Sequence, residues 1–186
     1  MAIPADSLGT LAEPPQRSVR HAGIDRLFHW FTALTVLTLM ATGLLPHLGM
    51  PFDWIEVHWI AGLALVALTV FHILRALFWQ HFRTIWFGAA ERNKYSVAQK
   101  LMHHAMALMV LAAVCTGLLM LKKISTPFLA RDPYFLAMST WGIVYVIHGL
   151  AALAAVTLVI IHIYFALIPE NRRYLRAMVY GWMTRS

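Results

Sequence analysis

The sequence is poor in cysteine and in charge. Of its 186 residues, one is a cysteine and 12% are charged. The single thiol, Cys115, excludes a disulfide within the chain and any zinc or iron–sulfur site built from its own cysteines. Its apolar surroundings indicate a packing role. Because soluble domains carry charge on about a quarter of their residues, the low charge argues against an ordinary soluble domain.

The chain is instead rich in apolar residues, which make up 60% of it and gather in long runs. A helix needs about 20 apolar residues to cross the bilayer core. Four segments are long enough: Phe28–Leu45, Val57–Trp79, Leu101–Leu121 and Trp141–Ile168. We therefore expect an all-α integral membrane protein, a four-helix bundle. Residues 23–178 would form the transmembrane domain, with a flexible N-terminal tail over 1–22 and a C-terminal tail over 179–186.

Lysine and arginine are distributed unevenly between the two sides of these helices. All but three of the 15 basic residues lie before the first helix, between the second and third, or after the fourth. The exceptions are Lys122, Lys123 and Arg131. Because cytoplasmic loops carry the excess of positive charge, both termini are predicted to be cytoplasmic. The net charge of +7 then follows from this topology and does not indicate a nucleic-acid partner.

The chain contains an internal repeat. The segment His29–Leu45 aligns with His103–Leu119, and both end in Thr-Gly-Leu-Leu. The segment His58–Leu77 aligns with His148–Leu167, so that His58 matches His148 and His72 matches His162. We expect two related helical hairpins packed as one bundle.

Histidines fourteen residues apart recur on the second and fourth helices. That spacing spans about 21 Å of helix and returns to nearly the same face. One such histidine is more often an interfacial or packed residue than a ligand, but a recurring pair is harder to explain that way. Ionisable residues inside a membrane mark function by default. The paired spacing therefore predicts two sites, one near each face of the bilayer.

The cofactor that suits these sites is haem b. Zinc needs a close tetrahedral ligand cluster, and ligands about 21 Å apart on one helix cannot share an ion. An apolar porphyrin takes two axial imidazoles, and a chain without Cys-x-x-Cys-His cannot attach haem covalently. Small residues would let the porphyrin approach the helices, although they also serve ordinary helix packing. They are Gly43, Gly62, Gly117 and Gly149.

Three stretches resemble the cytochrome b subunit (gamma subunit) of membrane-bound formate dehydrogenases. Nickel–iron hydrogenase b-type cytochromes and bacterial cytochrome b561 are relatives of that family. The stretches are RLFHW (26–30), KYSVAQK (94–100) and HGLAALAAVTLVIIHIYFAL (148–167). The resemblance covers about residues 26–170. It implies a multi-pass protein of the bacterial inner membrane with two haems, coordinated by His29 with His162 and by His58 with His148.

The resemblance also implies a quinone pocket beside the haem on the cytoplasmic side. Ser96 and Gln99, within KYSVAQK, would contribute to it. Ser96 stands where the formate dehydrogenase pattern has asparagine, and the shorter side chain changes the reach. Arg26 could pair with a haem propionate by a charge-assisted hydrogen bond, although a plain positive-inside charge explains it equally well.

His72 and His103 depart from the family pattern, which usually lacks histidine at both places. Since His72 is equivalent to His162 in the repeat, a symmetric pairing of His72 with His162 is the alternative to His29 with His162. In the favoured pairing, His72 is a second-shell, propionate or quinone-site residue.

The predicted function is electron transfer across the membrane between an outer redox partner and a quinone. The outer loops, about residues 46–56 and 122–140, have no room for a catalytic domain, so iron–sulfur and catalytic oxidoreductase subunits would supply the electrons. A self-sufficient cytochrome b561-type superoxide/quinone oxidoreductase is the alternative, and it would use the outer cations. A histidine-lined metal or proton transporter without haem is a third class. Other expected partners are membrane lipid and a second copy of the chain.

Overall fold

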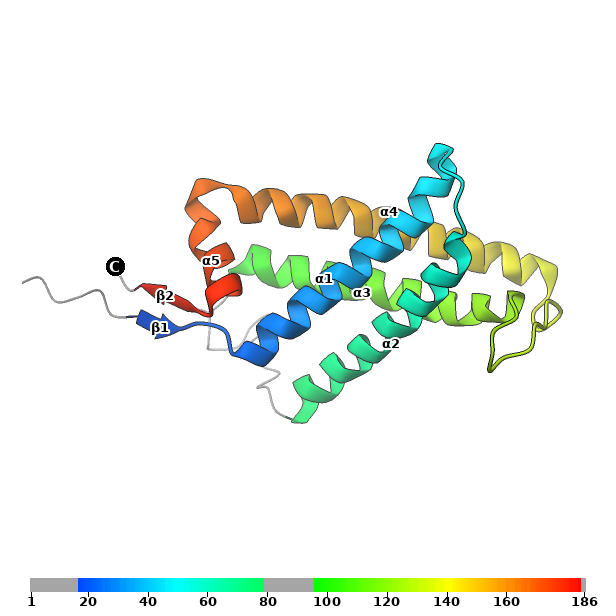
Figure 1. The fold of residues 1–186 in the computed structure, drawn as a ribbon, viewed down its shortest axis with the longest axis horizontal. Coiled ribbons are helices and arrows are strands. Elements are labelled where there is room, and N and C mark those ends of the chain that lie inside the picture. Colours follow the sequence, from blue (N-terminus) through cyan, green and yellow to red (C-terminus); the bar gives the residue numbers. More distant parts are fainter. Residues whose placement is uncertain (1–16, 79–95, 185–186) are drawn as a thin grey trace, which may run out of the picture.

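Four long helices make up most of the protein (Figure 1). The computed structural model describes residues 17–78 and 96–184. The helices are α1 (Gly23–Leu44), α2 (Trp54–Phe78), α3 (Val97–Met120) and α4 (Met138–Leu167). With the turns that extend α1 and α3, they give four apolar segments of 25 to 30 residues, each long enough to cross a membrane. The predicted four-helix membrane fold is confirmed. Every helix begins three to five residues before its predicted start.

The helices pack as two antiparallel hairpins. Helix α1 lies along α2, and α3 lies along α4, while the first hairpin crosses the second obliquely (Figure 1). The first hairpin turns through the 3₁₀ helix η2 (Leu45–Leu48), which contains Pro46. Gly49 follows with a φ of 81°, in the left-handed region that glycine adopts without strain.

Most large apolar side chains lie on the outside of the bundle. Leu65, Trp141, Val144 and Ala151 are buried, whereas many leucines, isoleucines and phenylalanines are exposed. In water such a surface would aggregate. In lipid it meets an equally apolar solvent, so contacts between the helices depend on close packing and on polar groups.

The connection between α3 and α4 is folded back onto the bundle. It begins with the 3₁₀ helix η4 (Leu121–Lys123). The indole of Trp141 is 1% exposed, and its Nε1–H donates to the carbonyl of Pro133 at 3.0 Å. The ammonium of Lys123 lies 4.5 Å from the centre of the same ring. We call this end of the bundle, which also carries η2, the loop end.

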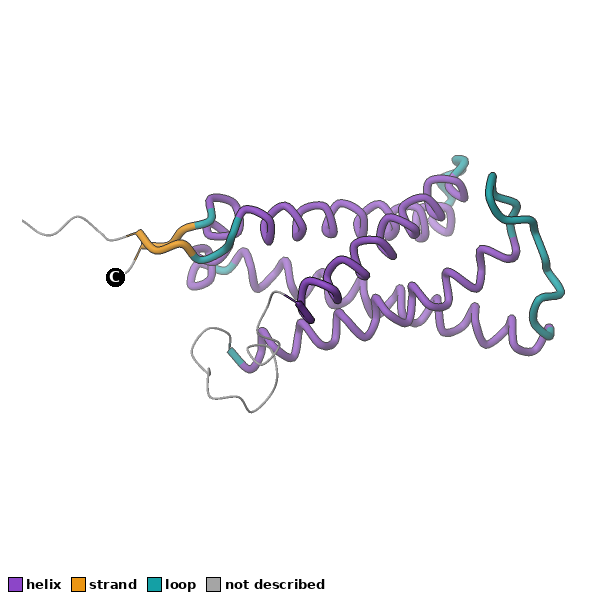
Figure 2. Tube along the Cα trace, turned by 90° about the horizontal axis from the view of Figure 1, so that it is seen from below, coloured by secondary structure: helices purple, strands orange, loops and turns teal. Residues whose placement is uncertain are grey.

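The opposite end, which we call the terminal end, carries the first and last described elements, the strands β1 (Arg17–Val19) and β2 (Trp182–Thr184) (Figure 2). These strands pair antiparallel, within segments predicted as tails. After α4 the chain forms the 3₁₀ helix η5 (Pro169–Asn171) and the short helix α5 (Arg172–Tyr180). Pro169 follows the end of α4, where a proline cannot continue the helix, and α5 was not predicted. Its signal was present, since Gly181 closes it with a φ of 90°.

Candidate haem-binding site

Two histidines from different hairpins face each other at the loop end. His58 on α2 and His148 on α4 have ring centroids 6.4 Å apart, with the planes 70° from parallel. Both residues come early in their helices, and both helices begin at the loop end, which is why the aligned positions meet. We call His58 and His148 the loop-end pair.

A threonine holds each imidazole of the loop-end pair. Thr42 Oγ1 lies 2.8 Å from Nδ1 of His58, and Thr116 Oγ1 lies 2.9 Å from Nδ1 of His148. These threonines are the matched residues of the two Thr-Gly-Leu-Leu sequences. Each anchor therefore lies on the partner helix of the same hairpin, α1 for α2 and α3 for α4.

The threonine hydroxyls fix which ring nitrogen carries hydrogen. The hydroxyl of Thr42 donates to the carbonyl of Thr38 at 2.8 Å, and that of Thr116 donates to the carbonyl of Ala112 at 2.6 Å. When the hydroxyl hydrogen is used in this way, each threonine oxygen is left to accept from Nδ1–H of the imidazole. We assign this tautomer from the hydrogen-bond network; it leaves the lone pair on Nε2, the state in which an imidazole binds a metal.

The glycines that follow the two threonines leave room beside the imidazoles. A methyl group at Gly43 would meet only Cε1 of His58, at 3.7 Å, and one at Gly117 would meet only the ring of His148, from 3.4 Å. Gly62 and Gly149, on the histidine helices, have no atom within 4 Å of such a methyl group. All four glycines thus border space that other described residues leave open.

A second cross-hairpin pair lies at the terminal end. His29 on α1 and His162 on α4 have ring centroids 6.2 Å apart, at an angle of 56°. We call them the terminal-end pair. The hydroxyl of Thr32, one turn along α1 from His29, is buried without a hydrogen-bond partner among the described residues. Other threonines of α1 donate to a carbonyl four residues earlier. The hydroxyl of Thr32 instead stays available to a polar group close to the terminal-end pair.

His72 and His103 form a third pair, also at the terminal end. Their ring centroids are 5.8 Å apart. Phe28 stacks on His72 at 5.3 Å with the rings 13° from parallel. The structure thus brings His29 to His162, and it brings His72 to His103. We did not predict this third pairing, although the histidines that form it were visible in the repeat.

The first two pairs have the separation that one iron requires. Two imidazole nitrogens, each bound at about 2 Å, place the ring centroids about 6 Å apart. The observed centroid distances are 6.4 Å and 6.2 Å. Within the described residues, no group of three or more His, Cys, Asp or Glu side chains could hold a metal ion. A haem takes its four equatorial ligands from the porphyrin and two axial ligands from the protein, so two imidazoles fit it.

Ser96 and Gln99, predicted at a quinone site, begin α3 as a capping box. Ser96 Oγ accepts from the backbone N–H of Gln99 at 3.2 Å, and Gln99 Oε1 accepts from the backbone N–H of Ser96 at 2.9 Å. Such a box satisfies two amides that the helix leaves unpaired. It uses the carbonyl oxygen of Gln99, whose NH₂ group can still donate. Residues 94 and 95 of the same motif lie outside the described residues.

Arg26 contacts the C-terminal segment. Its Nη1 donates to the carbonyl of Val179 at 2.9 Å. A Cβ on Gly181 would approach this guanidinium to 2.9 Å, a contact that a shift of the flexible Arg26 side chain could relieve, so the positive φ is the main reason for glycine there. The nearby indole of Trp30 donates to the carbonyl of Met178 at 3.3 Å. Arg26 thereby ties α1 to α5, and its predicted role toward a propionate stays a prediction.

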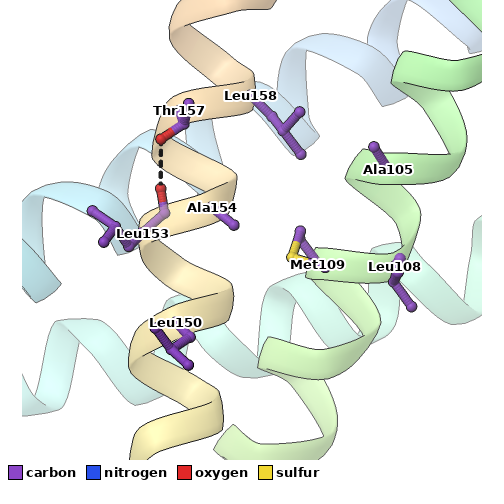
Figure 3. Close-up of a pocket in the computed structure, with 8 residues that line it drawn as sticks. All are labelled: Ala105, Leu108, Met109, Leu150, Leu153, Ala154, Thr157 and Leu158. Carbon is purple, nitrogen blue, oxygen red and sulfur yellow. Dashed lines mark hydrogen bonds between the residues drawn. The ribbon is translucent and has the colours of Figure 1, made fainter.

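An apolar groove of about 530 Å³ lies between α3 and α4 (Figure 3). On α4 it falls between the levels of His148 and His162. Its only side-chain hydroxyl, that of Thr157, donates to the carbonyl of Leu153 within α4. The lining residues are Ala105, Leu108, Met109, Leu150, Leu153, Ala154, Thr157 and Leu158. Such a surface suits a hydrocarbon chain.

Four membrane-length helices with facing imidazoles at both ends define a membrane protein of the cytochrome b class. The family model described as prokaryotic cytochrome b561 matches residues 20–181. The chain therefore belongs to the prokaryotic cytochrome b561 family. A search of curated proteins gives no match.

Membership establishes several features at the level of the family. The family binds b-type haem, and its members are multi-pass bacterial membrane proteins that transfer electrons across the membrane. The resemblance to b-type cytochromes seen in the sequence is confirmed to this extent. The more specific likeness to the formate dehydrogenase gamma subunit stays a prediction.

Proposed function

We propose that the chain carries electrons between a redox partner and a membrane quinone through two b-type haems. The observation that supports this is the pair of cross-hairpin histidine couples at opposite ends of the bundle, each with ring centroids 6.2 to 6.4 Å apart. His58 and His148 would hold one haem, and His29 and His162 the other. A haem held between two imidazoles would supply reversible one-electron chemistry, and both protein ligand positions would be taken by the histidines.

The protein contributes fixed imidazoles. The hydrogen bonds of Thr42 and Thr116 keep Nε2 of the loop-end pair directed at a ligand and lower the cost of orienting the rings. The hydroxyls of Thr42 and Thr116 also donate to backbone carbonyls within α1 and α3, so their hydrogens are satisfied inside the helices. Because each pair joins the two hairpins, ligand binding would also fasten the hairpins together.

The distribution of charge supports an orientation with the terminal end in the cytoplasm of a bacterial inner membrane. The described basic residues of that end include Arg20, Lys100, Arg172, Arg173 and Arg176. The loop end carries only Lys122, Lys123 and Arg131. By the positive-inside rule, the loop-end pair would then lie near the outer face.

The quinone would bind at the start of α3, near the terminal end. Gln99 supports this because its NH₂ group can donate to a quinone oxygen while its carbonyl oxygen caps the helix. The hydroxyl of Ser96 can donate in the same way. This puts quinone chemistry beside the cytoplasmic solution, where protons are exchanged.

The electron partner would be a separate protein that docks at the loop end. The described loops of that end, residues 45–53 and 121–137, form tight turns without a domain of their own. This favours iron–sulfur and catalytic oxidoreductase subunits as partners. In the alternative, a self-sufficient superoxide/quinone oxidoreductase, the cations of this end would attract the substrate. Lys122 and Lys123 instead lie over the rings of Phe135 and Trp141, which favours a structural role.

Quinol-driven haem reduction tests the proposed function. The purified chain in lipid nanodiscs is mixed with menadiol or decylubiquinol, and the reduced b-haem band is followed by stopped-flow spectroscopy. We expect reduction within seconds. A chain that shows a b-haem spectrum but reacts with neither quinol would contradict the quinone-reactive role. Purification at native expression level then separates the two candidates, since a complex subunit brings its partners with it and a self-sufficient enzyme does not.

A further inference from the structure

The third pair, His72 and His103, is the repeat counterpart of the terminal-end pair. The alignment matches His103 with His29 and His72 with His162, so the couple His29–His162 maps onto His103–His72. The ring separations agree, at 6.2 Å and 5.8 Å. The loop-end pair differs, because the repeat matches His58 with His148. The counterpart of this pair is therefore the pair itself, and no second pair arises. The bundle therefore has one histidine couple at the loop end and two at the terminal end.

Polar groups surround the third pair on the side of the chain termini. Arg75, one turn along α2 from His72, makes a 2.6 Å ion pair with Asp25 on α1. The contact between Phe28 and His72 lies one turn deeper between the same two helices. The side chains of Arg75 and Asp25 are 24% and 32% exposed. The contacts that lead from His72 past Phe28 to this ion pair therefore reach the solution.

On its other side, the third pair adjoins the start of α3. His103 follows Gln99 by one helical turn, and residues four apart lie on one face of a helix. The same face begins at Ser96. A quinone ring bound by Ser96 and Gln99 would thus lie one turn from the imidazole of His103, with His72 beyond it.

We propose that His72 and His103 form a proton relay between the quinone site and the solution at the terminal end. This inference rests on the quinone-reactive function proposed above. Imidazole suits the task because it can accept a proton at one ring nitrogen while releasing one from the other. Rings 5.8 Å apart can be joined by a single bridging water. The relay runs from the Asp25–Arg75 end through His72 to His103 and then to a quinone oxygen.

The relay balances the chemistry of the quinone. Reduction of a quinone to its quinol consumes two electrons, which the haems deliver, and two protons, which form two O–H bonds. The imidazole of His103 gives a proton to the quinone oxygen nearer to it and recovers one from His72. His72 recovers its proton from water near Asp25. The other oxygen takes its proton from the solution at the start of α3, where Ser96 and Gln99 are exposed. Oxidation of the quinol runs both paths in reverse and returns both protons to the solution at the terminal end.

The test is quinol-driven haem reduction in His72→Ala and His103→Ala, each as the full chain in nanodiscs. Stopped-flow traces with menadiol or decylubiquinol should slow by about a hundredfold or more, because positioned acid–base groups contribute about 10²- to 10⁴-fold. Haem content, haem spectrum and the rate of dithionite reduction should stay as in the wild type. Imidazole added to His103→Ala should restore part of the lost rate. His103→Gln, which keeps a polar side chain but no ring, serves if the alanine variant fails to fold.

His47→Ala is the control for removal of a histidine. His47 lies in η2 at the loop end, at the opposite end of the bundle from the third pair. We expect the quinol rate of this variant to stay close to that of the wild type. His104 does not serve as a control, because its ring centroid lies 5.6 Å from that of His103. Equal rates in all variants, with an active wild type, would overturn the relay. Loss of a haem in His72→Ala or His103→Ala would also overturn it and make the third pair an iron ligand. A wild type that neither quinol reduces contradicts the quinone-reactive function, and the relay with it.

Discussion

The two ends of the bundle present their histidines differently. At the loop end, Thr42 and Thr116 bond to both imidazoles of the couple, at 2.8 and 2.9 Å. At the terminal end, no hydrogen bond to His29 or His162 occurs among the described residues, and Phe28 packs against a further histidine couple. In the proposed function, the loop end would serve coordination alone. The terminal end would combine coordination with the proposed proton relay.

The repeat explains why the ends differ. A two-fold relation between the hairpins turns the couple His58–His148 into itself, so both of its anchors are the same kind of residue. It turns His29–His162 into a separate couple, His103–His72. If only His29 and His162 hold a haem at the terminal end, the third pair, His103 and His72, is not needed for coordination and can serve another function. The following experiments break or sharpen this comparison.

Removal of a loop-end histidine should have the largest effect. In His148→Ala the iron loses one of two axial ligands, and the haem content should fall from about two to about one per chain. The pyridine haemochrome assay measures this ratio. The same variant should retain the terminal-end haem, whose ligands lie on the other side of the bundle. Unchanged haem content would show that His148 is not a ligand.

The terminal end should distinguish its two couples. His29→Ala should lose one haem, whereas His72→Ala should retain both, because the structure places His29, and not His72, against His162. Haem content and the low-spin spectrum are measured for both variants side by side. The assignment is wrong if His72→Ala loses a haem while His29→Ala keeps both.

Removal of a threonine anchor should have an intermediate effect. Thr116→Val keeps the shape of the side chain but leaves Nδ1–H of His148 without its acceptor. Partners of metal-bound histidines contribute about tenfold to a hundredfold in metal affinity, so one haem should leave about tenfold faster. Transfer of haem to apomyoglobin measures this rate. Thr157→Val is the control, since that hydroxyl bonds only to the carbonyl of Leu153. Equal rates of haem loss in the two variants would show that the hydrogen bond of Thr116 to His148 does not stabilise haem binding.

The smallest effect is expected at the terminal clamp, the hydrogen bonds from Arg26 and Trp30 on α1 to carbonyls of α5. Trp30→Phe removes one hydrogen bond, 3.3 Å long and exposed, to the carbonyl of Met178. A net loss of about 0.5–1 kcal/mol in the free energy of unfolding follows, with haem content unchanged. Thermal unfolding followed by the haem absorbance would show it. A loss of haem in this variant would mean that the clamp also positions His29.

The membrane helices and the facing histidines were accessible from the sequence because they depend on local pattern. Apolar length defines a span whatever surrounds it, and the fourteen-residue spacing fixes two histidines on one helix face. The repeat further indicated which histidines are equivalent. It did not indicate which of them meet, since the symmetric pairing of His72 with His162 satisfied the same pattern.

What the sequence did not reveal depends on contacts between distant segments. The third pair arises from how α2 and α3 approach across the hairpins. The short helix α5 is held by hydrogen bonds from Arg26 and Trp30, more than 140 residues away in the chain. The capping box of Ser96 and Gln99 is a local sequence pattern. It was not predicted, because both residues were interpreted only as part of a quinone site. The threonine anchors were visible only as matched residues without a role.

The most direct test of the account is the haem stoichiometry and redox titration of the purified wild-type chain. Facing imidazoles at both ends predict about two low-spin b haems per chain that titrate with two separate midpoint potentials. The potentials should differ because the loop-end imidazoles are hydrogen-bonded, whereas His29 and His162 have no hydrogen bond among the described residues. A single haem, a third haem or no haem would contradict the assignment of one haem to the loop-end pair and one to the terminal-end pair.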